Sequence, residues 1–318
     1  MIRCEDQVFV LDSENTTYAF EVLKSGQLCH LYYGAKLDVF ANLEALRHKA
    51  NNINGCVCTY DDSDPNFTLD EYPLEYSGLG KGDLRQPAID IIFADKTRTT
   101  DFLYDSYSIK KGNVIYSDLP YAKDENEAAE TLTIVLKDRY HHVTIELSYS
   151  VFDYDCLIRS TKLINNEDDL TLLSLMSNQL DFATNDYRFI HFTGDWTNEM
   201  NMNDIVLKGG KYACESRGGS SSNRANPFVM LVGKHTDEDY GEAYGFNLFY
   251  SGNHSEVCDV DGHQKLRFLS GINPSTLFYT VKKNEVFEAP QALLTYSRQG
   301  LGGIRRNTHG FIKNHVLP

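Results

Sequence analysis

The dominant pattern along the chain is an alternation of hydrophobic and polar residues, and it is clearest between residues 143 and 151. The hydrophobic positions there are Val143, Ile145, Leu147, Tyr149 and Val151, and the polar ones are Thr144, Glu146, Ser148 and Ser150. Successive side chains of a β-strand point to opposite faces, so this spacing gathers the hydrophobic side chains on one face. We therefore predict a strand that buries one face.

Further segments are rich in the Tyr, Phe, Ile, Val and Thr residues that fit a pleated surface. They are residues 16–24, 87–95, 130–138, 169–177, 244–252 and 286–296. Turn-forming residues lie at 24–26, 111–113, 165–168 and 251–253. Strands and turns that recur at short intervals predict an all-β fold with sheets packed face to face.

Two segments depart from the strand pattern. Residues 38–52 place Phe40, Leu43 and Leu46 at helical spacing, which predicts a short helix near residues 40–50. Residues 298–318 are predicted to begin a C-terminal helix, and the acidic run 124–130 is predicted to be a charged loop. The sequence has no internal repeat and no long Pro-, Gly- or Ser-rich divider. We therefore expect one β-domain over residues 1–296 and a helical segment over residues 297–318.

The charge, the apolar content and the cysteines of the chain limit the partners and the cell compartment that we expect. The formal net charge of -15 argues against nucleic acid, because phosphate binding needs an excess of Lys and Arg. No apolar window reaches the roughly 18 residues of a membrane span, and the N-terminus does not have the pattern of a secretory signal. The seven cysteines include no C-x-x-C pair, so we expect reduced cysteines in a cytoplasmic protein.

The stretch CESRGGSSSNRANPF, from Cys214 to Phe228, invites a catalytic interpretation. A phosphate-binding loop of the form G-x-x-x-x-G-K-S/T needs a Lys, and none follows Gly218 and Gly219. A nucleophile elbow of the form G-x-S-x-G needs Gly at position 223, where the chain has Asn223. We predict a rigid turn between strands, in which Gly supplies positive φ and the hydroxyls cap backbone groups.

The generic metal motifs are weak. Asp62, Asp64 and Asn66 match the first ligands of a calcium loop, but Phe67 and Pro73 occupy the positions of its Gly and Glu. An exposed acidic turn is therefore predicted there, and Cys56-Val-Cys58 is only a weak signal.

His141 and His142 are adjacent, and on a strand their side chains would point in opposite directions. They are predicted to be ordinary strand histidines that do not share a metal ion. We predict no metal site and no cofactor.

Trp196 is the only tryptophan, and it lies among polar residues in HFTGDWTNEMN. A Trp ring can stack on the C–H face of a sugar while neighbouring carboxylates and amides bind its hydroxyls. A Trp buried in the core or at an interface is the alternative interpretation. Both interpretations stay open at this point.

Several motifs together resemble the N-terminal domain of α-galactosidases of glycoside hydrolase family 36. They are LCHLYYGAKL (28–37), YPLEYSGLGKGDLRQPAI (72–89), GDWTNE (194–199), ESRGGSSSNRANPF (215–228), GINPSTLFYTVKKNEVFEAPQALLTYSRQGLGGI (271–304) and KNHVLP (313–318). They follow the order of that family from near residue 18 to residue 318. The resemblance implies a β-supersandwich similar to the galactose mutarotase fold.

The resemblance also implies that the catalytic residues lie outside this chain. In the family this domain precedes a (β/α)₈ barrel, which carries the Asp nucleophile and the Asp acid/base. Residues 297–318 would then begin the linker helix to that barrel. The implied reaction is hydrolysis of terminal α-1,6-linked galactose, as in melibiose and raffinose, with retention and without a cofactor.

Two residues of this chain are implied to bind substrate. Trp196 matches a Gly-x-Trp loop near the sugar, and Asn54 lies where a loop reaches the pocket of a neighbouring subunit in tetramers. The chain departs from the family pattern at Asn198, Gly218 and Asn223, which replace an Arg, an Arg and a His. These changes put the substrate preference in doubt.

Three functions are weighed. The first is a non-catalytic domain that packs on the barrel, aids oligomerisation and shapes the mouth of the pocket. The second is a stand-alone carbohydrate-binding module, which the aromatic content and Trp196 support. The third is an enzyme similar to an aldose 1-epimerase, which would need a His and a carboxylate on opposite sides of a sugar.

Overall fold

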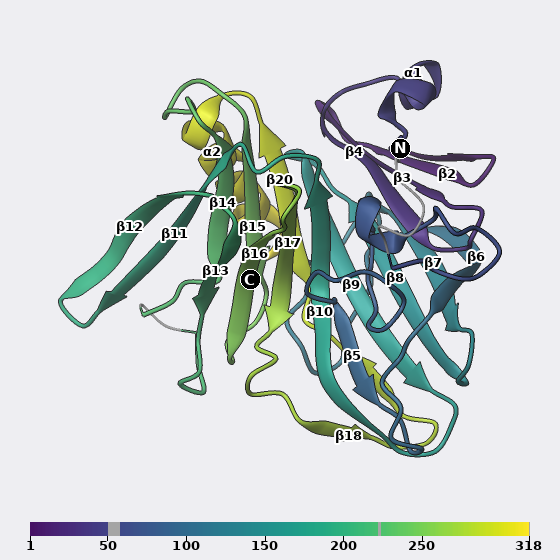
Figure 1. Cartoon of the computed structure of the whole chain (residues 1–318). Coiled ribbons are helices and arrows are strands. Elements are labelled where there is room, and N and C mark those ends of the chain that lie inside the picture. The colour runs from purple at the N-terminus through teal and green to yellow at the C-terminus, as the bar shows by residue number, and fades with distance from the viewer. Residues whose placement is uncertain (50–57, 222–223, 318) are drawn as a thin grey trace.

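The computed structural model describes residues 1–49, 58–221 and 224–317, and within these ranges nearly all regular structure is β-sheet (Figure 1). The strands form three sheets, and every strand pair inside them is antiparallel. The N-terminal sheet has the order β1-β2-β3-β4. Its strands are β1 (Ile2–Glu5), β2 (Val8–Asp12), β3 (Thr16–Val22) and β4 (Leu28–Ala35).

The two larger sheets make up most of the molecule. The six-stranded sheet has the order β13-β16-β17-β10-β18, and β5 also pairs with β10. Its strands are β5 (Ile89–Ile92), β10 (Leu170–Phe182), β13 (Gly210–Glu215), β16 (His254–Val260), β17 (Leu266–Ile272) and β18 (Tyr279–Val281).

The ten-stranded sheet has the order β12-β11-β14-β15-β20-β9-β8-β7-β6, and β19 also pairs with β9. Its first strands are β6 (Phe102–Lys111), β7 (Glu130–Asp138), β8 (Val143–Val151), β9 (Cys156–Asn165) and β11 (Tyr187–Asp195). The others are β12 (Asn198–Val206), β14 (Phe228–Gly233), β15 (Ala243–Leu248), β19 (Val286–Glu288) and β20 (Ala292–Ser297).

The sheets are packed face to face around one large hydrophobic core. Phe246 of β15 stacks on Phe268 of β17 with ring centroids 4.0 Å apart, which joins the two larger sheets. Phe20 of β3 stacks on Tyr149 of β8 at 5.0 Å, which joins the N-terminal sheet to the ten-stranded one. The predicted all-β fold with packed sheets is confirmed.

In the described part of the chain, two α-helices and one short 3-10 helix (Leu69–Glu71) accompany the sheets. Helix α1 (Val39–Leu46) packs on the N-terminal sheet, and the Asp38 carboxylate accepts a hydrogen bond from the Ala41 N–H at its start. It ends at Arg47, whose backbone is extended, so the helix is shorter than predicted. Helix α2 (Gly300–His315) covers the outer face of the ten-stranded sheet, where the buried Phe311 packs near Phe152.

Two details of the sequence prediction are wrong. Residues 286–296 do not form one strand: β19 and β20 are separated around Pro290, which has no N–H to donate to a neighbouring strand. His141 and His142 lie in the bend between β7 and β8 and not in a strand. The backbone N–H groups of Tyr140 and His141 donate to the Asp138 carboxylate and stabilise this bend.

Candidate functional site

The β11–β12 hairpin carries Trp196 at its tip. Trp196 and Thr197 form a tight connection between Asp195 and Asn198, which lie opposite each other in the ladder. Thr197, the second residue of this connection, has a positive φ of 68°, as the third residue of a type II turn does. The Trp196 side chain is 83% exposed, so Trp196 is not a core residue of this domain.

Gly194 permits the bulge that precedes this turn. The register of the ladder shifts between Thr193 and Asp195. A Cβ on Gly194 would clash with the carbonyl oxygen of Asn198 and would lie 2.9 Å from the Cα of Glu199. The glycine of the G-D-W sequence is therefore required by the local structure, because only Gly allows the two strands to approach this closely.

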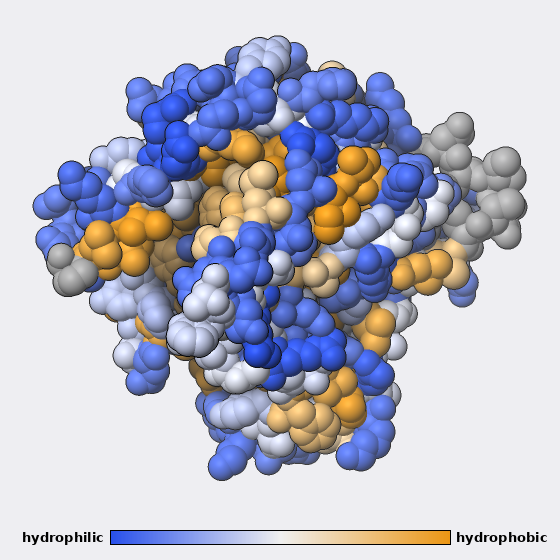
Figure 2. Space-filling view, turned by 90° about the vertical axis from the view of Figure 1, so that its left-hand side faces the viewer, coloured by the Kyte–Doolittle hydropathy of each residue, from blue (hydrophilic) through white to orange (hydrophobic). Residues whose placement is uncertain are grey.

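The outward side chains of β12 form an exposed hydrophobic surface. Met200, Met202 and Val206 are each about half exposed, and Met202 lies opposite Phe192 of β11 in the ladder. Figure 2 looks onto this side of the molecule and shows orange and tan areas bordered by blue hydrophilic ones. Contiguous exposed hydrophobic patches are typical of surfaces at which proteins make contacts.

The β13–β14 connection, residues 216–227, is a structured loop in its described part, as predicted. The hydroxyl of Ser216 donates to the Ser220 carbonyl at 2.5 Å, and the Gly219 N–H donates to the Asn253 side chain at 2.6 Å. The Ser221 N–H donates to the Ser251 carbonyl at 2.8 Å. The first bond lies within the loop, and the other two fix the loop to the turn that follows β15.

The same loop contacts the hairpin. The N–H of Asn226 donates to the carbonyl of Phe192 at 3.1 Å, and the Asn226 side-chain amide lies 3.6 Å from the Met200 sulfur. Arg224 lies 3.7 Å from the carboxylate of Asp195, next to Trp196. The loop therefore supports the hairpin that presents Trp196.

The three departures from the family pattern have different surroundings. Asn198 is exposed at the end of the turn, where its carbonyl accepts a hydrogen bond from Asn201. A Cβ on Gly218 would have no heavy atom within 4 Å, so the loop has room for a larger side chain there. Asn223 and the predicted substrate residue Asn54 lie outside the described residues.

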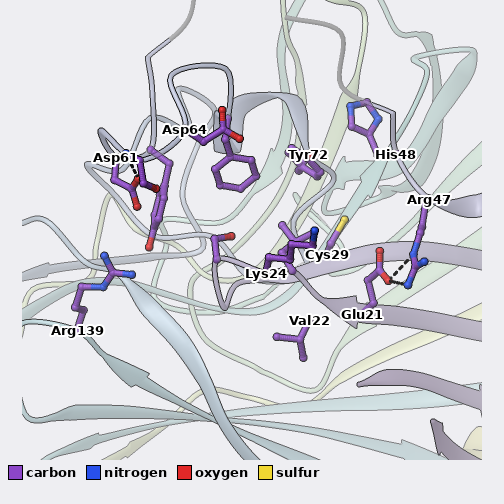
Figure 3. A pocket seen from close by; sticks show the side chains of 15 residues that line it. Glu21, Val22, Lys24, Cys29, Arg47, His48, Asp61, Asp64, Tyr72 and Arg139 are labelled. Carbon is purple, nitrogen blue, oxygen red and sulfur yellow. Dashed lines mark hydrogen bonds and ion pairs between the residues drawn. The ribbon is translucent and has the colours of Figure 1, made fainter. Parts of the chain in front are cut away.

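A cavity of about 740 Å³ lies between the N-terminal sheet and residues 58–72 (Figure 3). Its wall includes the aromatic residues Tyr60, Phe67 and Tyr72, several charged groups and the buried Cys29. Burial raises the pKa of the Cys29 thiol, which therefore stays protonated. The sequence analysis missed this cavity, because its wall comes from three separate segments and from Arg139.

The charged groups of the cavity lie on different sides of it. Arg47 binds Glu21 on one side, with its guanidinium 2.8 Å from the carboxylate, whereas Asp61 and Asp64 lie on the other (Figure 3). Burial and the nearby Lys265 charge lower the pKa of His48, so this imidazole is neutral at neutral pH. The cavity thus offers both donors and acceptors next to aromatic rings.

Buried ion pairs occupy the interior of the sandwich. The Arg267 guanidinium binds Asp181 at 2.8 Å and Asp83 at 2.8 Å, and all three side chains are buried. Burial works against ionisation of Asp181, but the charges of Arg267 and Arg85 lower its pKa. The opposite charges of these buried groups therefore balance one another inside the sandwich.

A second network surrounds Glu75, which is fully buried. Its carboxylate accepts hydrogen bonds from Arg159 at 2.8 Å, from Tyr149 at 2.8 Å and from Tyr18 at 2.6 Å. His30 lies 3.2 Å from the same carboxylate. Although burial opposes ionisation, the Arg159 charge lowers the pKa of Glu75.

The described residues include no group of three or more His, Cys, Asp or Glu side chains that could hold a metal ion. In the region of the weak calcium motif, Asp61 and Asp64 accept hydrogen bonds from the N–H groups of Ser63 and Asn66. This is the pattern of an acidic turn. No described helix is both long and apolar enough to cross a membrane.

The fold defines this chain as a β-supersandwich domain. Residues 26–282 match the glycosyl hydrolase family 36 N-terminal domain, and the chain belongs to that family. The resemblance found in the sequence motifs is confirmed.

The relatives with solved structures are longer than this chain. α-Galactosidase AgaB of Geobacillus stearothermophilus superposes with a TM-score of 0.95 at 32% identity, covering 100% of this chain and 44% of that one. A doubly substituted variant of AgaA from the same organism, solved in complex with raffinose, has a TM-score of 0.93 at 33% identity, covering 98% of this chain and 43% of that one.

A relative from another organism is longer still. The bifunctional α-galactosidase/sucrose kinase AgaSK of Mediterraneibacter gnavus is 32% identical over 323 residues, which are 98% of this chain and 33% of that protein. The chain therefore spans less than half the length of each of these relatives.

Proposed function

We propose that this chain is the non-catalytic N-terminal domain of an α-galactosidase that hydrolyses terminal α-galactosides of the melibiose and raffinose type with retention. The observation that carries the proposal is the superposition of the whole chain on under half of an α-galactosidase, at a TM-score of 0.95. The catalytic Asp pair would lie in the barrel, so the chain by itself is expected to be inactive.

The domain would pack on the barrel and shape the mouth of the sugar pocket. Support comes from the exposed Trp196 at a hairpin tip that is fixed from behind by the β13–β14 loop. An exposed Trp on a rigid hairpin can stack on a sugar ring with little loss of conformational entropy. Asn54 is proposed to reach the pocket of a neighbouring subunit.

Two further proposals concern the assembly and its location. We place the domain in a homo-oligomer, a tetramer as in similar enzymes, and the hydrophobic surface of β12 supports such a contact. We place the protein in the cytoplasm, and the free thiols of the six described cysteines support a reducing compartment.

The test compares the 318-residue chain with the product of the complete reading frame, using an aryl α-galactoside as substrate. We expect only the longer polypeptide to release the phenol, and the product sugar to keep the α configuration at first. Turnover by the short chain would show that the catalytic carboxylates lie within the sandwich. An inactive longer polypeptide would also overturn the proposal.

A second candidate function, carbohydrate binding by the domain itself, is favoured by the cavity of Figure 3. Aromatic rings beside carboxylates and cations are the groups that bind sugars. Titration of the isolated chain with melibiose, followed by calorimetry, tests it. Saturable heat that Tyr72→Ala abolishes and Tyr240→Ala preserves would support binding in the cavity, since Tyr240 is 74% exposed elsewhere.

The epimerase alternative gains no support from the buried His–Glu pairs. His30 with Glu75, and His254 with Glu256, are each in direct contact and are closed to solvent. A sugar cannot lie between two such partners.

A further inference from the structure

A buried histidine–glutamate pair lies directly beneath the loop that supports Trp196. His254 and Glu256 are two residues apart on β16, both side chains are 0% exposed, and the Nδ1 of His254 is 2.7 Å from the Glu256 carboxylate. The other ring nitrogen, Nε2, is 3.0 Å from the carbonyl oxygen of Ala225 in the β13–β14 loop. Both ring nitrogens therefore face acceptors.

This geometry makes the loop contact depend on the proton content of the pair. An imidazolium carries two N–H groups and can donate to Glu256 and Ala225 together, whereas a neutral imidazole can donate only one. A neutral His254 that keeps its proton toward the charged carboxylate turns a lone pair toward the Ala225 carbonyl. Two acceptors then face each other at 3.0 Å, and the loop contact becomes repulsive.

The loop transmits this change to the hairpin through the next residue. Asn226 follows Ala225 and holds β11 and β12 by its bonds to Phe192 and Met200. We propose that His254 and Glu256 are positioning residues for the β11–β12 hairpin, so that loss of the proton that this pair holds releases the loop and shifts Trp196. The consequence for sugar binding rests on the proposed function, but the movement of the hairpin does not.

The electrostatic surroundings support protonation of the pair up to neutral pH. Burial raises the pKa of Glu256 to about 7, although the hydrogen bond from His254 opposes this. Burial opposes protonation of His254, but its hydrogen bond and attraction to Glu256 outweigh burial and raise its pKa. The pair therefore loses its proton as the pH rises, and the loop is held more firmly at pH values below this titration.

Other titratable groups near the pair do not supply this response. On the neighbouring strand β13, Glu215 adds negative charge that further raises the pKa of His254, and burial raises the pKa of Cys214 to about 12. Cys258 on β16 is buried, and burial raises its pKa as well. Both thiols therefore stay protonated in the neutral range. On the hairpin, burial lowers the pKa of His191, which makes this residue the necessary control.

Trp196 provides a direct readout because the chain has only one tryptophan. We would record the indole ¹H–¹⁵N cross-peak of the 318-residue chain from about pH 5.5 to about pH 9, a range that brackets histidine titration. A single titration step in the peak position is expected. A peak that does not move across this range would overturn the proposal.

Three variants test whether this titration step comes from the His254–Glu256 pair. Glu256→Gln keeps a hydrogen-bond acceptor but removes the charge, so the step should move below about pH 6. Asn226→Ala should reduce the size of the step while the His254 ring still titrates. His191→Gln should leave the step unchanged.

Each variant can also contradict the proposal. An unchanged midpoint in Glu256→Gln, an unchanged step in Asn226→Ala, or a lost step in His191→Gln would overturn it. Far-UV circular dichroism verifies that each variant is folded, and the wild-type titration decides the question if Glu256→Gln does not fold. The readout uses no substrate, so an inactive longer polypeptide would refute the proposed function and leave this test intact.

Discussion

At the scale of single residues, Asp181 has a central place in the interior. It accepts two hydrogen bonds from Arg267 at 2.8 Å, one from Arg85 at 3.2 Å and one from the Leu74 N–H at 3.0 Å. Arginine matches a carboxylate with two parallel N–H groups, and both partners are shielded from water here. The network thereby joins β10 and β17 to the loop that contains Arg85.

We expect Asp181→Asn to lower the free energy of unfolding by about 3–5 kcal/mol, because it removes a carboxylate charge that pairs with both of the buried guanidinium groups, those of Arg85 and Arg267. Urea denaturation measures the change. Asp186→Asn is the control, since its pair with Lys234 is largely exposed, and it should change the free energy of unfolding far less than Asp181→Asn does. A loss of similar size in both variants would contradict the argument.

The effect of Asp181 also has a defined pH dependence. Its pKa is lowered in the folded protein, so its ionised form stabilises the fold above the unfolded pKa of about 4. This contribution is lost as the pH falls through the folded value. The difference between wild type and Asp181→Asn should therefore stay constant from neutral pH to about pH 5 and narrow only in stronger acid.

At the scale of elements, the β11–β12 hairpin depends on the close approach at Gly194. Gly194→Ala should destabilise the hairpin by about 1–3 kcal/mol, because its Cβ would overlap the backbone at residues 198 and 199. Hydrogen exchange of the amides in β11 and β12 would report the change as faster exchange.

Gly218→Ala is the matched control for this variant. A Cβ there meets no atom within 4 Å, so exchange in the hairpin should not change. Equal protection of the hairpin amides in wild type and Gly194→Ala would show that the strands can separate without cost. The bulge would then have no role in presenting Trp196.

At the scale of the whole molecule, the hydrophobic surface of β12 should make the isolated domain bind a hydrophobic dye or self-associate. Replacing Met202 by Gln and Val206 by Thr should lower dye fluorescence at least about twofold and reduce association in sedimentation experiments. Leu84→Gln is the control, because Leu84 is 75% exposed away from this strand. A monomer without dye binding would contradict the proposed contact surface.

The sequence by itself determined the class of fold and the family. Alternation at residues 143–151 and the turn residues at 24–26 and 165–168 encode strands and turns through local geometry, which spacing along the chain reports directly. The residue pattern predicted strands at two places where the structure has none. Pro290 divides one predicted strand, and His141 lies in a bend. The domain boundary near residue 297 and the role of Asn54 stay predictions.

Only the tertiary structure decided which distant residues meet. Ala225 lies 29 positions from His254, and Glu75 lies 84 positions from Arg159, yet each pair is in hydrogen-bond contact. Nothing in the spacing of these residues reveals such contacts, because sheet order and register bring them together. The exposure of Trp196 was likewise undecided in the sequence, where a polar neighbourhood fits both an interface and a sugar. Its exposure follows from its place at the tip of the β11–β12 hairpin, a position that strand pairing and packing define.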